Sequence, residues 1–250
     1  MAISLASLEK GKSPHPPRMV IYGPGKIGKS TFASQAPNPV FVQTEDGLDG
    51  IDTTKFPLSK TYDEFMEALA ALYTGDHKHK TVVVDSADWL ETLIWQKVAA
   101  DAGKAHIGDI GYQKGYADAL DYWKKILEAL NSLRIEKGMA VIIIAHHQVR
   151  KFEPPDMEGY DRYEIKLHKN SSPILREWAD IIGFANYKVI TKSTGNDFND
   201  NDKFKAIGSA ERVLHLTEKP MYAAGNRFGL PDTIPFSWAD FSATFATATK

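Results

Sequence analysis

The chain has 250 residues, of which 43% are hydrophobic and 25% are charged, a composition typical of a soluble globular protein. Its formal net charge of -2 provides no overall attraction to nucleic acid, and the lack of cysteine excludes disulfides and thiolate metal sites. No apolar run approaches the roughly 18 residues of a membrane span, so the sequence predicts a cytoplasmic protein without membrane contact.

The first segment, residues 1–17, is polar and rich in proline near its end. This composition favours an extended arm that leads into the first strand. We expect one main domain over residues 18–235, because a chain of this length can bury most of its apolar surface in a single core. Residues 236–250 are predicted to form a C-terminal helix or tail.

A glycine-rich segment follows the short apolar run 18–22 and matches the phosphate-binding pattern G-x-x-x-x-G-K-[ST] at every fixed position. The pattern requires a strand before the loop and a helix after it, and residues 30–35 are suited to open that helix. Its glycines let backbone N–H groups approach phosphate oxygens closely. The residues expected to bind a nucleoside triphosphate are Gly23, Pro24, Gly25, Lys26, Ile27, Gly28, Lys29, Ser30 and Thr31.

Two residues of this loop carry its chemistry. Lys29 is expected to reach the β- and γ-phosphates, and the hydroxyl of Ser30 is expected to ligate Mg²⁺. The competing interpretation is an ordinary glycine-rich turn with a surface lysine, and the flanking strand and helix favour the nucleotide site over it. ATP and Mg²⁺ are therefore the predicted ligands.

Apolar strands and amphipathic helices alternate after this loop. A second buried strand begins at residues 40–42, and residues 102–115 form a glycine-containing loop. The last strand of this series, predicted over 139–145, leads into His146 and His147. We interpret these two residues as packing or hydrogen-bonding residues, because no third metal ligand is evident. Apolar spacing predicts helices over 62–73, 88–101 and 116–137, and strands over 81–86 and 139–145.

The pattern weakens beyond residue 150. Residues 151–172 are polar without clear periodicity, which predicts a long loop, and such loops are usually functional or disordered. The alternation of strands and helices predicts an α/β fold with a mainly parallel central sheet flanked by helices, and with antiparallel strands added at one edge. Further strands are predicted over 180–191, 212–217 and 220–224, with a hairpin turn within 195–202 and a helix near 237–248.

Asp85, at the end of an apolar strand, is the expected partner of the phosphate loop. In nucleotide-binding sheets the ligand lies beyond the carboxyl ends of the strands, where Asp85 can hold Mg²⁺ through water or through Ser30. The alternative is a helix cap, because Asp85, Ser86 or Asp88 could cap the helix 88–101.

The order of these elements resembles the core of the RecA recombinase family over about residues 18–230, which implies a RecA-like P-loop NTPase core. More closely, the chain is similar to the small RecA-like ATPases of phages that act in single-strand annealing and recombination. Residues 41–49 resemble the strand end that holds the catalytic glutamate of that family, which implies Glu45 as the base that orients the attacking water. Residues 82–86 resemble its second nucleotide motif.

Two further matches concern the γ-phosphate and a neighbouring subunit. Residues 144–150 resemble the strand end at which a glutamine senses the γ-phosphate and opens the second DNA-binding loop, which implies Gln148 as the sensor. Residues 224–228 resemble the segment that reaches the ATP of the next subunit, which implies Arg227 as a cation that acts in trans.

The resemblance implies a Mg²⁺-dependent ATPase that binds single-stranded DNA and promotes annealing or strand exchange. DNA is expected at the loops near 103–115 and 150–172, although residues 150–169 hold five basic and five acidic side chains. Self-association into a ring or filament is expected, and a single-strand-binding protein is a further candidate partner. The alternatives are a motor ATPase of helicase or packaging type and a non-catalytic nucleotide-binding accessory protein.

Overall fold

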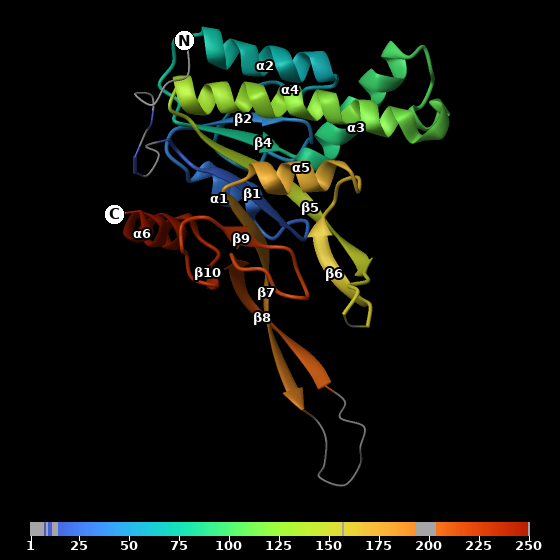
Figure 1. Ribbon diagram of the computed structural model, residues 1–250. Helices are drawn as coiled ribbons and strands as arrows, with labels where there is room; N and C mark the ends of the chain where they lie inside the picture. Colours follow the sequence, from blue (N-terminus) through green and yellow to red (C-terminus); the bar gives the residue numbers. More distant parts are fainter. Residues whose placement is uncertain (1–7, 9, 12–14, 157, 194–203, 250) are drawn as a thin grey trace.

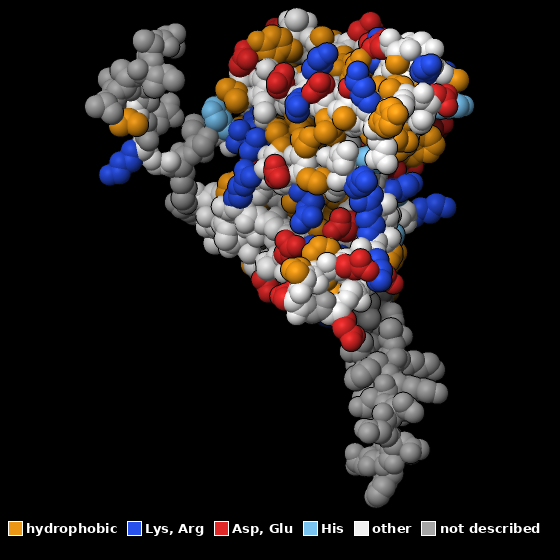
Figure 2. Space-filling view, turned by 45° about the vertical axis from the view of Figure 1, so that its right-hand side comes forward, with side chains coloured by type: hydrophobic (Ala, Val, Ile, Leu, Met, Phe, Trp, Pro, Cys, Tyr) orange, Lys and Arg blue, Asp and Glu red, His pale blue; other side chains and the backbone are white. Residues whose placement is uncertain are grey.

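The computed structural model describes residues 8, 10, 11, 15–156, 158–193 and 204–249. The predicted hairpin turn within residues 195–202 and most of the predicted arm, residues 1–17, lie outside these ranges. None of the helices within them is long and apolar enough to cross a membrane. Figure 2 shows Lys, Arg, Asp and Glu side chains interspersed over one face of the protein, in keeping with the small net charge.

A ten-stranded sheet forms the centre of the protein (Figure 1). Its strands are β1 (Arg18–Gly23), β2 (Pro39–Gln43), β3 (Thr54–Lys55), β4 (Thr81–Asp85), β5 (Ala140–Phe152), β6 (Tyr160–Ile165), β7 (Ile181–Ser193), β8 (Phe204–His215), β9 (Gly225–Asn226) and β10 (Thr233–Pro235). The strand order is β10-β8-β7-β1-β5-β4-β2-β3, with β6 paired to β5 and β9 paired to β7. The pairs from β7 through β1, β5, β4 and β2 to β3 are parallel, whereas β6, β8, β9 and β10 pair in antiparallel fashion. The predicted fold class is confirmed.

Helices cover both faces of this sheet. They are α1 (Lys29–Ser34), α2 (Tyr62–Thr74), α3 (Ala87–Asp101), α4 (Lys114–Glu136), α5 (Ser171–Trp178) and α6 (Trp238–Ala248), with 3-10 turns η2 (Ile107–Asp109) and η3 (Gly111–Gln113). Apolar residues of α2, α3, α4 and α5 share one core with one face of the sheet, and α1 and α6 share a second core with the other face. The predicted helices are confirmed, with ends that differ by one or two residues.

Local sequence explains where α2 begins and which face it buries. In α2, Thr61 caps the N-terminus by accepting a hydrogen bond from the backbone N–H of Glu64 at 3.1 Å, and Phe65, Leu69 and Leu72 are buried. The C-terminal helix α6 packs against α1, with the rings of Phe32 and Phe241 5.8 Å apart. The division of the chain at residue 235 stays a prediction.

The prediction of a loop over residues 151–172 is wrong. β5 continues to Phe152 and pairs with β6 in an antiparallel hairpin, in which Phe152 lies opposite Tyr160, and α5 follows at Ser171. The outer part of β5, from His146 onward, contains no fully buried residue. In β6 only Arg162 and Ile165 are buried, three positions apart. The hairpin therefore lacks the alternation of apolar and polar residues by which a strand is recognised, so the sequence pattern could not reveal it.

The strand predicted over residues 220–224 is also absent from the described structure. This segment forms only isolated bridges, in which Tyr222 pairs with Tyr163 and Lys219. Tyr222 and Ala223 are nevertheless buried, and the hydroxyl of Tyr22 donates a hydrogen bond to the carbonyl oxygen of Ala223. The apolar composition therefore reflects the burial of an irregular segment rather than a strand.

Candidate active site

The phosphate loop joins β1 to α1 at the centre of the sheet. Because β1 lies between the parallel strands β5 and β7, the loop leaves the sheet beside the carboxyl ends of both. Gly28 has a φ of 104°, in the left-handed region that favours glycine, and a Cβ there would lie 2.5 Å from a guanidinium nitrogen of Arg212. At Gly23 a Cβ would lie 2.2 Å from the carbonyl oxygen of Ala185. Gly23 is therefore required by close packing against the backbone, and Gly28 by its backbone conformation.

Lys29 is buried at the base of this loop. Its ammonium donates hydrogen bonds to the carbonyl oxygens of Gly23, at 3.1 Å, and Pro24, at 2.8 Å. Burial lowers the pKa of Lys29, and the nearby carboxylates of Asp85, Asp88 and Glu45 oppose this effect. A buried ammonium gains most from an anionic partner, and within the described residues none lies within ion-pair distance of Lys29. The site is therefore suited to a phosphate group.

Ser30 and Asp85 meet at the predicted metal position. The hydroxyl of Ser30 donates a hydrogen bond to Asp85 Oδ2 at 2.6 Å. Burial raises the pKa of Asp85, and the hydrogen bond from Ser30 opposes this. Hydroxyl and carboxylate oxygens are ligands that Mg²⁺ prefers, so the pair fits this ion. The described residues contain no cluster of three or more protein ligands that could hold a metal ion. Magnesium at this position would therefore take its further ligands from phosphate oxygens and water.

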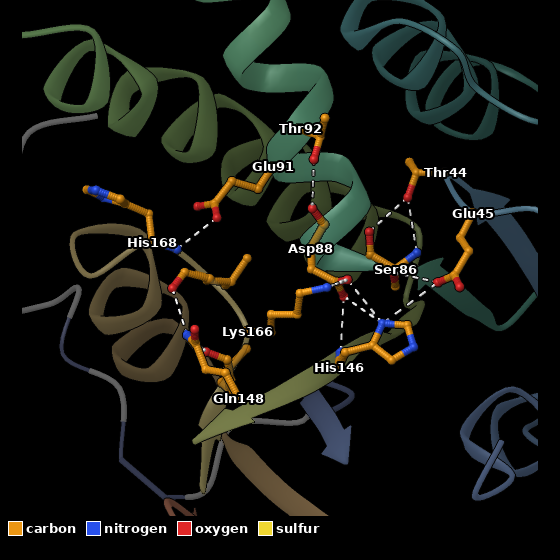
Figure 3. Close-up of polar contacts among 12 residues, drawn as sticks. Thr44, Glu45, Ser86, Asp88, Glu91, Thr92, His146, Gln148, Lys166 and His168 are labelled. Atoms are coloured by element: carbon orange, nitrogen blue, oxygen red, sulfur yellow. Dashed lines mark hydrogen bonds and ion pairs between the residues drawn. The ribbon is translucent and has the colours of Figure 1, made fainter. Parts of the chain in front are cut away.

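Glu45 is positioned by contacts between the ends of β2 and β4 (Figure 3). Thr44 Oγ1 donates to the carbonyl oxygen of Ser86 at 2.8 Å and accepts a hydrogen bond from its backbone N–H at 3.0 Å. The hydroxyl of Ser86 then donates to Glu45 Oε2 at 3.0 Å. This network holds the Glu45 carboxylate on the same side of the sheet as Lys29.

The predicted catalytic and magnesium-binding residues Lys29, Ser30, Glu45 and Asp85 converge on one cleft of about 370 Å³. Its walls come from the phosphate loop, from the segment after β2 and from the ends of β4 and β5. The residues that line it are Lys26, Gly28, Lys29, Ser30, Thr31, Glu45, Asp46, Gly47, Ile51, Asp85, Ile144 and His146. Among the other predicted loop residues, Gly23 and Pro24 accept hydrogen bonds from Lys29.

Three residues that the sequence analysis did not assign to the site belong to its surroundings. His146 lines the cleft, and Asp88 accepts hydrogen bonds from its backbone N–H and from its ring Nδ1, both at 3.0 Å. Arg212 of β8 donates a hydrogen bond to the carbonyl oxygen of Ile27 at 2.9 Å. The sequence marks Asp88 only as a candidate helix cap. No local pattern marks Arg212, because it reaches the loop from β8 at the antiparallel edge of the sheet.

Gln148 does not lie in this cleft. Its side-chain amide donates to the carbonyl oxygens of Ile165, at 2.8 Å, and Leu167, at 3.0 Å, at the base of the β5–β6 hairpin (Figure 3). The residues of β5 that line the cleft are Ile144 and His146, and His146 is the polar one, two positions before Gln148. The predicted contact between Gln148 and the γ-phosphate therefore has no support in this geometry.

Arg227 lies beside the first residues of β1 and β7, at the end of these strands opposite to the phosphate loop. It forms an ion pair with Asp180 at 3.2 Å and donates to the carbonyl oxygen of Glu177 at 2.7 Å. Asp180 also pairs with Arg18, the first residue of β1, at 2.7 Å. Arg227 therefore does not approach the phosphate loop of its own chain, and its role in trans stays a prediction.

A parallel sheet, a phosphate loop and acidic residues at the ends of the neighbouring strands together define a P-loop NTPase. The chain belongs to the AAA domain family, because the family model with the description "AAA domain" matches residues 15–228. This is an ATPase-type domain, and its membership supports nucleotide binding and hydrolysis, usually with Mg²⁺. A search of curated proteins found no match.

Proposed function

We propose that the protein is a Mg²⁺-dependent ATPase that binds single-stranded DNA and promotes annealing or strand exchange of the phage recombination type. The observation that carries the ATPase activity is the convergence of Lys29, Ser30, Glu45 and Asp85 on one cleft. Lys29 stabilises negative charge on the terminal phosphates, and Glu45 orients the attacking water. Mg²⁺ held by Ser30 and Asp85 would neutralise charge on the phosphate oxygens.

The DNA-binding part of the proposal rests on the way two predicted DNA-binding segments meet. The ring of Tyr116, at the start of α4, stacks on His168 with centroids 4.5 Å apart and an interplanar angle of 7°. Trp95 packs edge-on against both rings. These contacts join the start of α4, directly after the predicted DNA-binding segment 103–115, to the segment that follows β6, which supports one shared binding surface.

Tyr112 is the most exposed aromatic residue at this junction. Its side chain is fully accessible, and its φ of 55° is followed by a φ of 57° at Gln113. Two consecutive non-glycine residues in the left-handed region cost roughly 1 to 3 kcal/mol each, a cost often found at functional sites. The backbone therefore holds Tyr112 outward at an energetic cost. Base stacking on such a ring contributes about 1 to 3 kcal/mol per base in single-stranded DNA complexes.

Charge is segregated along the neighbouring β5–β6 hairpin. Glu164 pairs with Arg162 and Arg176, so it does not oppose the cations near His168. The basic residues nearest the base of the hairpin are Arg150, Lys166 and Lys169, whereas Asp156, Glu158 and Asp161 lie toward its tip. The one basic residue at the tip end of β5, Lys151, pairs with Glu153 at 2.6 Å. This segregation supports DNA at the base of the hairpin, a feature that the equal counts of acidic and basic residues conceal.

Self-association belongs to the same proposal. Arg227 has a side chain that is 56% exposed and lies at the amino-terminal ends of β1 and β7, remote from its own phosphate loop. If the cleft of a neighbouring subunit faced Arg227, the guanidinium would reach the terminal phosphate of the ATP bound in that cleft. Loss of turnover in Arg227→Ala, with recovery on mixing with a subunit that lacks only Lys29, is the expected result for action in trans.

The decisive experiment measures ATP hydrolysis by the purified protein with Mg²⁺, with and without a long single-stranded oligonucleotide, at two salt concentrations. We expect stimulation by DNA that decreases as salt rises, and a loss of stimulation in Tyr112→Ala. Tyr73→Ala, at an exposed tyrosine at the end of α2, is the matched control and should retain it. Directional unwinding of duplex DNA would indicate a motor ATPase instead, and nucleotide binding without turnover would indicate an accessory protein.

A further inference from the structure

His146 is the only histidine that lines the described cleft, and it is held there by one acidic residue. Asp88, in the first turn of α3, accepts from the backbone N–H of His146 at 3.0 Å and from ring Nδ1 at 3.0 Å. The Asp88 side chain is 6% exposed, so this contact is shielded from water. Figure 3 shows the imidazole of His146 between Asp88 and Glu45.

The orientation of the ring follows from these contacts. Since Nδ1 faces the Asp88 carboxylate, it carries a proton, and Nε2 is left for the cleft. Within the described part of the chain, no residue forms a hydrogen bond with Nε2. The pair is therefore more than a link between α3 and β5, because it leaves one polar ring atom available beside the phosphate loop.

The electrostatic surroundings favour the charged ring. The hydrogen bond to Asp88 raises the pKa of His146, although burial and the positive charge of Lys29 work in the opposite direction. Burial works to raise the pKa of Asp88, but the hydrogen bonds from His146 outweigh it and hold that pKa below its usual range. The contact with Asp88 therefore favours the protonated ring more than in a free histidine, and in that state Nε2–H is a charged donor.

We propose that His146, held as an imidazolium by Asp88, donates a hydrogen bond to the terminal phosphate of bound ATP. His146 would then take the place at the end of β5 that the sequence predicted for Gln148, and Asp88 would be a positioning residue. Because ADP lacks the γ-phosphate, the contact would distinguish the two nucleotides. The chain would also supply a second cation besides Lys29 to the terminal phosphate without a neighbouring subunit.

The same acidic residue connects the ring to the DNA-facing side of the protein. Lys166, directly after β6, lies with its ammonium 3.7 Å from Asp88 Oδ2. One turn further along α3, Glu91 accepts from the backbone N–H of His168 at 2.8 Å. A shift of His146 toward a phosphate would therefore alter a carboxylate that also contacts the segment carrying His168.

The test compares His146→Gln and Asp88→Asn with wild type. The inference rests on the proposed nucleotide site, so binding of Mg-ATP and Mg-ADP is measured by calorimetry separately from turnover. We expect His146→Gln to lose roughly ten- to hundredfold in affinity for ATP, the range for a hydrogen bond to a charged group, with the affinity for ADP changed less than about twofold. His79→Gln is the matched control, because that ring lies against Asn38 in the segment between α2 and β4, away from the cleft.

A pH profile of kcat separates the charged contact from a structural role. The ionisable groups that face His146 are Asp88, Glu45, Lys29, Asp85 and Lys166, from α3, the end of β2, α1, the end of β4 and the segment after β6. They are unchanged in His146→Gln, so the difference between the two profiles isolates the imidazole. Wild-type kcat should fall as pH rises through the raised pKa of His146, that fall should be missing in His146→Gln, and Asp88→Asn should move it to lower pH.

The outcomes are distinguishable. An unchanged ratio of ATP to ADP affinity in folded His146→Gln, or identical pH profiles, would overturn the inference even if the protein is an active ATPase. A wild-type protein that binds ATP without turning it over, yet loses its preference for ATP in His146→Gln, would overturn the proposed ATPase activity while supporting the contact. Thermal unfolding of each variant establishes that it is folded.

Discussion

Replacing Lys29 by Met tests the nucleotide site most directly, because the change removes a buried charge and keeps most of the side-chain volume. Burial lowers the pKa of Lys29, so the folded state holds this proton less tightly than the unfolded state does. The ammonium therefore costs stability below its unfolded pKa of about 10.4. We expect Lys29→Met without nucleotide to unfold at the wild-type temperature or above it.

Mg-ATP should stabilise the wild-type protein but not Lys29→Met. A ligand present at 100 times its dissociation constant stabilises the folded state by about 2.7 kcal/mol. For a chain of this size each kcal/mol shifts the melting temperature by about 2 to 4 °C, so Mg-ATP should raise that of wild type by about 5 to 11 °C. In Lys29→Met the shift should disappear, together with phosphate release.

Thermal unfolding with and without Mg-ATP, followed by a phosphate-release assay, measures both effects. Lys124→Met, at an exposed lysine of α4, is the control and should retain the full shift. A full ATP-dependent shift in Lys29→Met would refute the assignment of the phosphate loop as the nucleotide site. A strong destabilisation without nucleotide would refute the argument that the buried ammonium carries an energetic cost.

Three further predictions concern other parts of the framework. Glu45→Gln should retain the ATP-dependent thermal shift and lose at least about 100-fold in turnover, and normal turnover would exclude Glu45 as the base. Gly28→Ala should weaken ATP binding and destabilise the protein by about 1 to 3 kcal/mol in urea unfolding, because it combines a φ of 104° with a contact to Arg212, and wild-type stability would contradict this. Asp180→Ala should lower the free energy of unfolding by about 3 to 5 kcal/mol at pH 7, because it leaves the partner arginines without their carboxylate. Burial works to raise the pKa of Asp180, but hydrogen bonds from Arg18 outweigh it and lower that pKa. The stabilisation by the Asp180 carboxylate is therefore fully present above pH ~3.9 and is lost as pH falls through the lowered pKa. Urea unfolding at pH 7 and pH 3 should therefore show a smaller difference between variant and wild type at pH 3, and an equal difference at both would contradict the reasoning.

The parts of the site that could be predicted are those written in contiguous sequence. The phosphate loop and its helix are one segment, and Asp85 follows from the rule that parallel strands end at the same edge of a sheet. Glu45 was inferred from a resemblance and lies in the same cleft. These residues need no knowledge of side-chain direction or of distant pairing.

The assignment at the end of β5 needed more than the sequence contains. Three polar residues, His146, His147 and Gln148, follow an apolar run, and a strand turns alternate side chains to opposite faces. Which one faces the cleft depends on where pairing ends, and β5 continues to Phe152 because β6 pairs with it. The contact of Asp88 with His146 joins residues 58 positions apart, so no local pattern marks it.

Arg212 was missed for a related reason. Its position beside Ile27 depends on the register of β8 on β7, which sequence alternation does not define between two antiparallel strands at a sheet edge. The sequence pattern does not reveal the polar β5–β6 hairpin, because the part of β5 from His146 onward has no buried residue and β6 buries only Arg162 and Ile165. In both cases the deciding contacts are long-range.

The reciprocal hydrogen bonds between Thr44 and Ser86 have a consequence for how this protein can vary. They fasten the end of β2 to the end of β4, so the position of Glu45 is set by two neighbouring strands and not by the connection that follows. The connection from residue 46 to β3 can therefore change in length without displacing the carboxylate. Insertions there would reshape the mouth of the cleft, and with it the choice of nucleotide or partner, while the hydrolytic geometry is inherited intact.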